Sequence, residues 1–253
     1  MKFHAKEVPV ESITRWRGLY RHEMSFQIIH DSIHSRPGWA KEFVLMEDGV
    51  GVGYGSLAVG GPWKDRPAIF EFFVLPSSRN HLFDHFAALV NAAGANKIET
   101  QSNDPLLTAM LHAFARDVAS ESILFHDRIT THLAPVGAKF RVAAKEDGLD
   151  ISADQLPAHG VVEVEGKGGK VAGKGGILFH YNRPYGDIYM DVEEGFRKRG
   201  LGSFLVQELK RLCYQLGSVP SARCNPKNIA SRKTLQKAGF VPCGHILVGT
   251  LVV

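Results

Sequence analysis

A turn rich in arginine and glycine carries the clearest chemical signal in the sequence. The turn consists of Arg197, Lys198, Arg199, Gly200, Leu201, Gly202 and Ser203. Glycine lets the backbone turn sharply and lets a ligand approach it closely, because no side chain stands in the way. A helix that begins here presents free N–H groups and the positive end of its dipole, which suit a phosphate or pyrophosphate. The spacing Arg-x-x-Gly-x-Gly therefore predicts a phosphate-binding turn, provided that a strand precedes it and a helix follows.

The flanking patterns supply that strand and that helix. Residues 188–192 have the pattern of a strand, and apolar residues at helical spacing predict a helix over 201–216 that Gly217 ends. The surrounding segment 195–240 contains ten Lys or Arg residues and one acidic residue, a net charge of +9. Such a concentration of positive charge indicates an anionic partner.

The first half of the chain repeats the order of elements found in the second. Val74 and Arg79 precede a helix as Val192 and Arg197 do, at an offset of 118 residues. In the first half, we expect helices at 12–33, 82–94 and 105–114, and strands at 42–46, 53–59, 68–75, 97–100 and 123–133. In the second half, we expect helices at 201–216 and 226–239, and strands at 177–180, 188–192, 222–224 and 245–253. Self-similarity at a fixed offset predicts a duplicated domain, with a boundary near residue 135.

The second half resembles the GCN5-related N-acetyltransferase (GNAT) superfamily, whose coenzyme A motif reads V-x-P-x-x-[RQ]-x-x-G-x-[GA]. Matches to this motif are Val192, Arg197, Gly200 and Gly202, and Glu194 replaces the usual proline. A second family element is matched by Asn228, Ser231, Leu235, Lys237, Gly239 and Phe240. The resemblance implies acetyl-CoA as the co-substrate. Backbone N–H groups of residues 198–203 would hold its pyrophosphate, and Arg197, Asn228 and Ser231 would also bind the coenzyme. The backbone at Met190 and Val192 would pair with the pantetheine arm.

The resemblance also implies the fold class. We expect an α+β chain with two GNAT-like domains, each a mixed, mostly antiparallel sheet flanked by helices. Residues 1–135 would form a degenerate copy and residues 136–253 the catalytic domain. At the positions of the two motif glycines the first copy has Leu82 and Asp84. Leucine blocks close approach to the backbone, and an aspartate in the first turn already satisfies the helix dipole, so this copy should not bind coenzyme A.

The reaction that the resemblance implies is direct attack of a neutral primary amine on the thioester. The amine must lose a proton, so we expect a general base on the strand that leads into the motif. Asp187, Tyr189, Asp191 and Glu193 alternate onto one face of that strand, and Asp187 and Glu193 are the leading candidates. Many relatives protonate the leaving thiolate with a tyrosine, whose position is taken here by Leu235. Tyr189 is then the candidate acid, with Cys224 a weaker one and solvent a third source.

Two other classes of function compete with this interpretation. The fold could persist as a non-catalytic, regulatory acyl-CoA-binding module, or the basic segment could bind nucleic acid. Nucleic acid is disfavoured because the charges flank a phosphate turn and no aromatic-rich strand platform accompanies them. The acceptor stays open among an amino acid, a polyamine, an aminoglycoside-like drug and a protein N-terminus.

Composition limits the class of protein further. The chain has 253 residues, of which 44% are hydrophobic, too many for a disordered chain. No apolar run approaches the ~18 residues of a membrane span, and the N-terminus lacks the apolar core of a secretion signal, so we expect a cytoplasmic protein without membrane contact. Residues 30–34 mimic a zinc motif and residues 168–175 a Walker A loop. Both lack an essential position, and we expect no metal.

Overall fold

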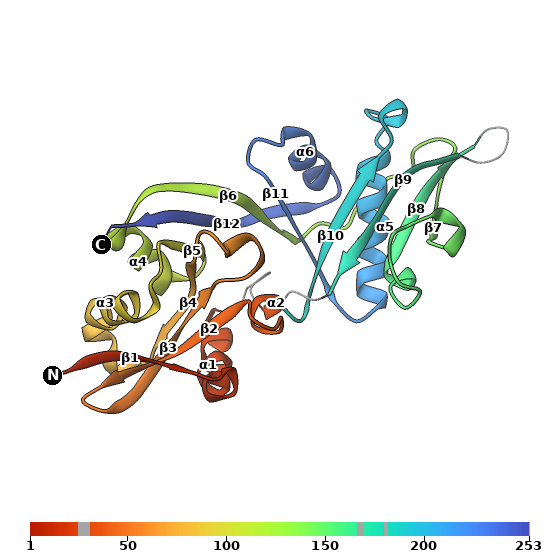
Figure 1. The fold of residues 1–253 in the computed structure, drawn as a ribbon. Coiled ribbons are helices and arrows are strands. Elements are labelled where there is room, and N and C mark those ends of the chain that lie inside the picture. Colours follow the sequence, from red (N-terminus) through yellow and green to blue (C-terminus); the bar gives the residue numbers. More distant parts are fainter. Residues whose placement is uncertain (25–30, 166–169, 180–181, 253) are drawn as a thin grey trace. The chain divides into compact units, whose positions relative to one another are not determined.

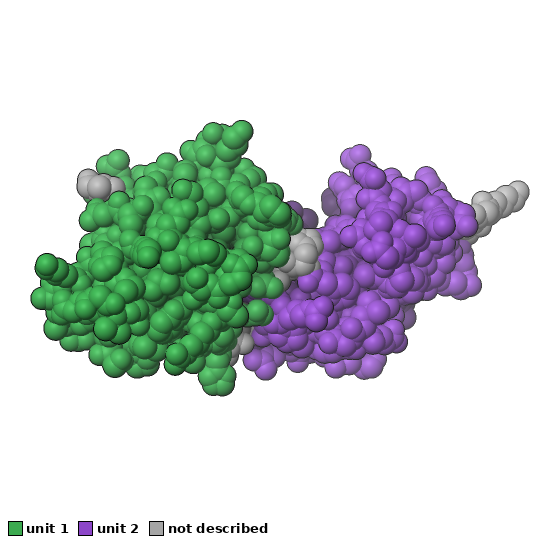
Figure 2. Space-filling model, turned by 60° about the horizontal axis from the view of Figure 1, so that its bottom comes forward, with its two compact units in different colours: residues 1–121, 244–253 green, residues 122–243 purple. Residues whose placement is uncertain are grey.

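The computed structural model describes residues 1–24, 31–165, 170–179 and 182–252, and Figure 1 shows the order of their elements. These residues form two compact units. The first unit contains residues 1–121 and 244–253, and the second unit contains residues 122–243 (Figure 2). The expected boundary is near residue 135, whereas the first boundary between the units lies after residue 121. The end of the chain, which we expected in the second half, belongs to the first unit.

The first unit is a sheet with helices packed on it. Its strands are β1 (Phe3–Val8), β2 (Ala40–Glu47), β3 (Val50–Ala58), β4 (Ala68–Val74), β5 (Lys97–Gln101), the start of β6 (Ala115–Asp127) and the end of β12 (Phe240–Leu251). Its α-helices are α1 (Thr14–Met24), α2 (Asp31–His34), α3 (Leu82–Ala93) and α4 (Pro105–Phe114), with 3-10 turns η1 (Val10–Ile13), η2 (Gly61–Trp63) and η3 (Pro76–His81). The strand order is β1-β2-β3-β4-β5-β12-β6, and β4 runs parallel to β5. A core of aliphatic and aromatic side chains joins α3 and α4 to this sheet.

The second unit has the same plan with fewer helices. Its strands are the end of β6, then β7 (Ala138–Val142), β8 (His159–Val164), β9 (Lys170–Leu178), β10 (Tyr185–Val192) and β11 (Val219–Cys224). Its helices are α5 (Leu201–Gln215) and α6 (Ile229–Lys237), with 3-10 turns η4 (Lys145–Asp147), η5 (Leu156–Ala158) and η6 (Glu194–Phe196). The strand order is β6-β11-β10-β9-β8-β7, antiparallel except for β10 and β11. Helix α5 packs against β8, β9 and β10 (Figure 1), and it contributes seven of the twenty buried residues of the core cluster.

The last strand corrects the expected assignment of residues 245–253 to the second half. Residues 246–250 of β12 pair antiparallel with residues 97–101 of β5, inside the first unit. Leu247 and Leu251 join the apolar core of that unit. Hydrophobic periodicity identifies a strand but not its partner, so this pairing across about half the chain could not be read from the pattern.

The helix expected over residues 12–33 is described only in part. Its described residues form the end of η1, then α1 and α2, and residues 25–30 between the two helices lie outside the described part. The strand expected at 123–133 runs instead over 115–127. The side chain of His34, the second histidine of the zinc-like pattern, is buried, with Nδ1 2.8 Å from Glu42 Oε1 and Nε2 3.1 Å from Glu71 Oε2. Glycines 168 and 169 and His30 also lie outside the described residues.

Matching hydrogen bonds confirm the internal repeat. Arg79 Nε donates to the Val74 carbonyl at 2.9 Å, and Arg197 Nε donates to the Val192 carbonyl at the same distance. Asp104 caps α4 by accepting from the Leu107 N–H at 3.0 Å, as Asn228 caps α6 by accepting from the Ser231 N–H at 3.0 Å. Both units therefore have the same strand–turn–helix connection and the same capped helix after the next strand.

Among the described residues, none of the helices has the length and apolar character needed to cross a membrane.

Candidate active site

Strands β10 and β11 separate to form a V-shaped opening in the sheet of the second unit. They pair in parallel only over residues 185–187 and 219–221. Beyond Asp187, residues 188–192 have register partners on β9 but none on β11 within the described part of the chain. The backbone of β10 can therefore pair with an extended ligand on this side, as an added strand would. Met190 and Val192, both predicted to contact the pantetheine arm, lie on this stretch.

The turn after β10 has the backbone shape of an anion-binding nest. Lys198 has φ +62° and Gly200 has φ +80°, and Arg199 between them is not among the residues with positive φ. Such changes in the sign of φ let successive N–H groups point into one concavity. Helix α5 begins at Leu201, and in the described residues no side chain caps its first turn. The N–H groups at the start of this 15-residue helix thus face the turn without an internal acceptor.

The basic side chains of the turn have different roles. Arg197 holds the turn against the strand, because its Nε bonds to Val192 and its guanidinium lies 3.7 Å from Asp191 Oδ1. Arg199 lies over the Phe196 ring at 5.4 Å and is exposed, as is Lys198. We conclude that Arg197 positions the turn, while Lys198 and Arg199 supply positive charge at its rim.

Gly202 has a packing role that the motif alone does not reveal. A Cβ at this position would lie 3.3 Å from Thr234 Cγ2 and 3.5 Å from Val192 Cγ2. Gly202 therefore lets α5 approach α6 and β10 closely, and a bulky residue here would disturb the fold as well as the turn. By contrast, a Cβ at Gly200 would meet only Lys237 Nζ, at 3.7 Å, so Gly200 is required for its backbone conformation.

The corresponding turn of the first unit has no nest. The 3-10 turn η3 runs directly into α3, and Leu82, at the position of Gly200, has φ −57°. The Leu82 N–H is already bonded to the Arg79 carbonyl. Asp84 Oδ2 lies 3.7 Å from His81 Nδ1 in the first turn of the helix. Backbone geometry and charge therefore both disfavour a phosphate at this end of α3.

Asp187 lies where the V-shaped opening begins. Its side chain is on the sheet face opposite α5 and is 5% exposed. Arg223 Nε donates to its Oδ2 at 3.1 Å, and Oδ1 is buried without a hydrogen-bond partner among the described residues. Burial raises the pKa of Asp187 to about 6, and the charge of Arg223 opposes part of this shift. The carboxylate is thus ionised at neutral pH and can still accept a proton.

The other predicted catalytic residues lie further along β10. Tyr189 is on the same face as Asp187 and is 41% exposed; partial burial raises the pKa of its hydroxyl. Glu193 is exposed in the turn, where its N–H bonds to the Ala172 carbonyl. Cys224 is buried, and burial raises the pKa of its thiol, which makes a thiolate less accessible. The structure therefore places Asp187 and Tyr189 on one face of β10, and Glu193 lies nearer to the turn at residues 197–203.

The two residues at the start of α6 that we predicted to bind coenzyme A also make contacts within the protein. Asn228 Oδ1 caps the helix by bonding to the Ser231 N–H, and both residues lie at its first turn. The amide nitrogen of Asn228 is on an exposed residue and can donate to a ligand. Ser231 interacts with the thiol of Cys224. These contacts place α6 beside β11, on the far side of the V-shaped opening from β10.

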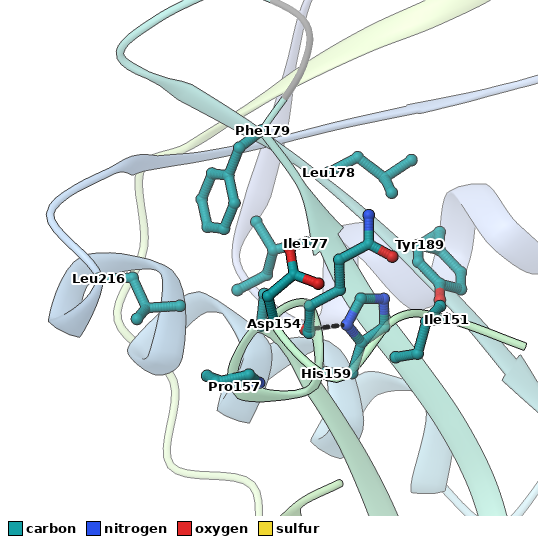
Figure 3. A pocket seen from close by; sticks show the side chains of 11 residues that line it. Ile151, Asp154, Pro157, His159, Ile177, Leu178, Phe179, Tyr189 and Leu216 are labelled. Atoms are coloured by element: carbon teal, nitrogen blue, oxygen red, sulfur yellow. Dashed lines mark hydrogen bonds between the residues drawn. The ribbon is translucent and has the colours of Figure 1, made fainter. Parts of the chain in front are cut away.

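A pocket beside Tyr189 was not predicted from the sequence. It has a volume of about 740 Å³, and Figure 3 shows the side chains around it. Its walls come from the irregular segment 151–159, from β9 and from the end of α5. His159 lies opposite Gly176, and its ring is 5.8 Å from the Tyr189 ring in an edge-on arrangement. A side chain at Gly176 would overlap the His159 ring, so this glycine lets rings on β8 and β10 meet across β9.

Comparisons with known proteins give one family match and several similar structures. Residues 133–240 match the model of the acetyltransferase (GNAT) family. A GNAT-family acetyltransferase from Colwellia psychrerythraea is similar over 100% of both chains, with a TM-score of 0.75 and 13% identity. A tandem GNAT protein from the clavulanic acid biosynthesis pathway is similar over 98% of both chains, with a TM-score of 0.60 and 15% identity. A GCN5-related N-acetyltransferase from Sphaerobacter thermophilus covers 98% of this chain and 95% of its own, with a TM-score of 0.59 and 13% identity. No curated protein matches the chain in sequence.

Proposed function

We propose that the protein, whose residues 133–240 match the acetyltransferase (GNAT) family, transfers an acetyl group from acetyl-CoA to a primary amine. The observation that carries the proposal is the nest at Lys198 and Gly200, next to the uncapped start of α5. This arrangement fits a pyrophosphate. The open edge of β10 over residues 188–192 fits an extended pantetheine arm. Acetyl-CoA would supply the thioester that the amine attacks.

The side chains near the start of the V-shaped opening have the properties that proton transfer requires. Asp187 is buried and has a pKa of about 6, so it is mostly ionised at pH 7.5 and can take the proton that the amine loses. Glu193 lies in the solvent-exposed turn, and we rank it second. Tyr189 is the candidate to donate a proton to the leaving sulfur, since its hydroxyl stays protonated at neutral pH.

A turnover assay tests the proposed function against a non-catalytic role. Acetyl-CoA is incubated with a panel of primary amines, and release of the coenzyme A thiol is followed. The proposal predicts amine-dependent thiol release. Tight binding of acetyl-CoA by calorimetry, with no release for any amine of the panel, would instead identify a regulatory acyl-CoA-binding module.

We expect one coenzyme A to bind per chain. The first unit lacks the nest, because Leu82 has a helical φ and its N–H is already bonded. Calorimetric titration of the intact chain with coenzyme A should give a stoichiometry of one. A stoichiometry of two would contradict the conclusion that the first unit has lost this site.

Replacing Tyr189 with phenylalanine should lower kcat more than it changes acetyl-CoA affinity. A dedicated acid contributes about 10²–10⁴-fold at most, and a thiolate leaves readily near neutral pH, so we expect a loss toward the lower end of this range. Steady-state kinetics decide the role of the hydroxyl. A raised KM for the amine with unchanged kcat would show that Tyr189 lines the acceptor pocket without acting as an acid.

A further inference from the structure

The pocket beside Tyr189 differs chemically from the acidic and basic surfaces around the phosphate turn. Its lining is mostly apolar, and the residues that line it are Ile151, Asp154, Gln155, Pro157, Ala158, His159, Ile177, Leu178, Phe179, Tyr189 and Leu216. A volume of about 740 Å³ is within the ~300–1,000 Å³ of small-molecule pockets. Among the described residues that form its walls there is no lysine or arginine.

One buried polar group in the lining indicates that the pocket takes a ligand with an N–H group. His159 is 3% exposed, and its Nδ1 donates to the Gln155 carbonyl at 2.7 Å, because a carbonyl can only accept. When the ring is neutral, this bond leaves Nε2 as an acceptor. In the described part of the chain, Nε2 has no hydrogen-bond partner. Figure 3 shows the His159 ring among the side chains that line the pocket, near Tyr189. A buried acceptor without a donor is costly, and an amine N–H would satisfy it.

The charges around the pocket select among amines. Asp154 is the acidic side chain in the lining, and Asp187 lies on the same strand face as Tyr189. A carboxylate bound here would face Asp154 without a cation to pair with, which excludes free amino acids on energetic grounds. A polyamine or an aminoglycoside would leave several polar groups unpaired against an apolar wall. Three ring side chains in the lining, Phe179, His159 and Tyr189, favour an aromatic occupant.

We propose that the acceptor is an aromatic primary monoamine without a carboxylate, bound with its nitrogen at His159 and Tyr189 and its ring in the apolar part of the pocket. This inference rests on the proposed acetyl transfer and narrows its substrate class. The nitrogen then lies next to the V-shaped opening, where the thioester would be placed. Leu216, from the end of α5, lies across the pocket from Tyr189 (Figure 3), so it contacts the end of the ligand distant from the nitrogen.

A comparison of matched amines tests this substrate class. Transfer of a phenyl ring from water into an apolar pocket should raise kcat/KM for 2-phenylethylamine over ethylamine by about 10- to 100-fold. Phenylalanine, which adds only a carboxylate to 2-phenylethylamine, should be at least about tenfold poorer than 2-phenylethylamine. Equal kcat/KM values for the three amines would overturn the inference.

A charge placed at the far end of the pocket gives a sharper test. Leu216 is 43% exposed and follows the last turn of α5, where a lysine is favourable to the helix, so Leu216→Lys should fold normally. The variant should lose about tenfold or more in kcat/KM for 2-phenylethylamine and gain for 4-(2-aminoethyl)benzoate, whose carboxylate meets the new ammonium. Val136→Lys, at a fully exposed valine outside the pocket lining, is the matched control and should change neither value.

Binding measurements separate failure of this inference from failure of the proposed function. If no amine is acetylated although coenzyme A binds, the proposed function fails. The pocket is then judged by calorimetry of 2-phenylethylamine and ethylamine in the presence of coenzyme A. Tighter binding of 2-phenylethylamine, weakened in Leu216→Lys but not in Val136→Lys, supports the aromatic pocket. Equal binding of both amines, or an unchanged preference in Leu216→Lys, overturns it.

Discussion

Replacing Gly200 with alanine should weaken acetyl-CoA binding by about 10- to 100-fold while the chain stays folded. Gly200 has φ +80°, a conformation that costs an L-residue about 1–2 kcal/mol. The turn can relieve this strain only by rotating its backbone, which turns N–H groups away from the pyrophosphate. Each hydrogen bond to a charged group contributes about 1.5–3 kcal/mol, and 1.4 kcal/mol corresponds to a factor of ten in affinity. Calorimetry with acetyl-CoA measures the loss.

Gly217→Ala is the matched control for this variant. Gly217 follows the other end of the same helix, has φ +75°, and has open space where a Cβ would be. Both variants should therefore lose a similar free energy of unfolding, but only Gly200→Ala should lose acetyl-CoA affinity. Gly202 would be a poorer test, because its Cβ would contact Thr234 and Val192. Equal affinities of the two alanine variants would show that the nest does not hold the pyrophosphate.

The turn at residues 197–203 and its supporting elements could be predicted from local sequence. The strand before the turn, the amphipathic helix after it and the capped helix that follows each depend on residues close together in the chain. The same holds for the repeat, where Arg79 and Arg197 make equivalent bonds to their strands. Local periodicity, capping residues and glycine positions report such features directly.

Features that depend on contacts between distant segments could not be predicted in this way. The last strand, β12, pairs with β5, and a local sequence pattern does not identify the partner of a strand. The pocket depends on His159 facing Tyr189 across Gly176, a contact set by the registers of β8, β9 and β10. The irregular segment 151–159, which forms one wall of that pocket, is not among the elements expected from the sequence. The burial of Asp187, which raises its pKa, likewise follows from tertiary packing.

Asp187→Asn should lower kcat by about 10²–10⁴-fold and leave acetyl-CoA affinity unchanged. The amide keeps the shape of the side chain but cannot take the proton that the amine loses. A protonated amine already gives log kcat/KM a slope of one against pH. A base with a pKa of about 6 should increase that slope to two below pH 6 in the natural protein, and the variant should keep a slope of one. Asp65→Asn, at an exposed aspartate outside the second unit, serves as the control.

Stability measurements distinguish a base from a structural carboxylate at this position. The pKa of Asp187 rises from 3.8 to about 6 on folding, so between these values the folded state binds more protons than the unfolded state. Its contribution to stability is therefore present below about pH 4 and is lost as pH rises through 6. Asparagine does not titrate, so Asp187→Asn should gain stability relative to the natural protein when pH is raised from 4 to 7.5. Thermal unfolding at both pH values measures this gain. If Asp187→Asn instead loses both stability and activity, most strongly at pH 7.5, the ion pair between Asp187 and Arg223 is structural. Glu193→Gln is then the next variant to test for the general base.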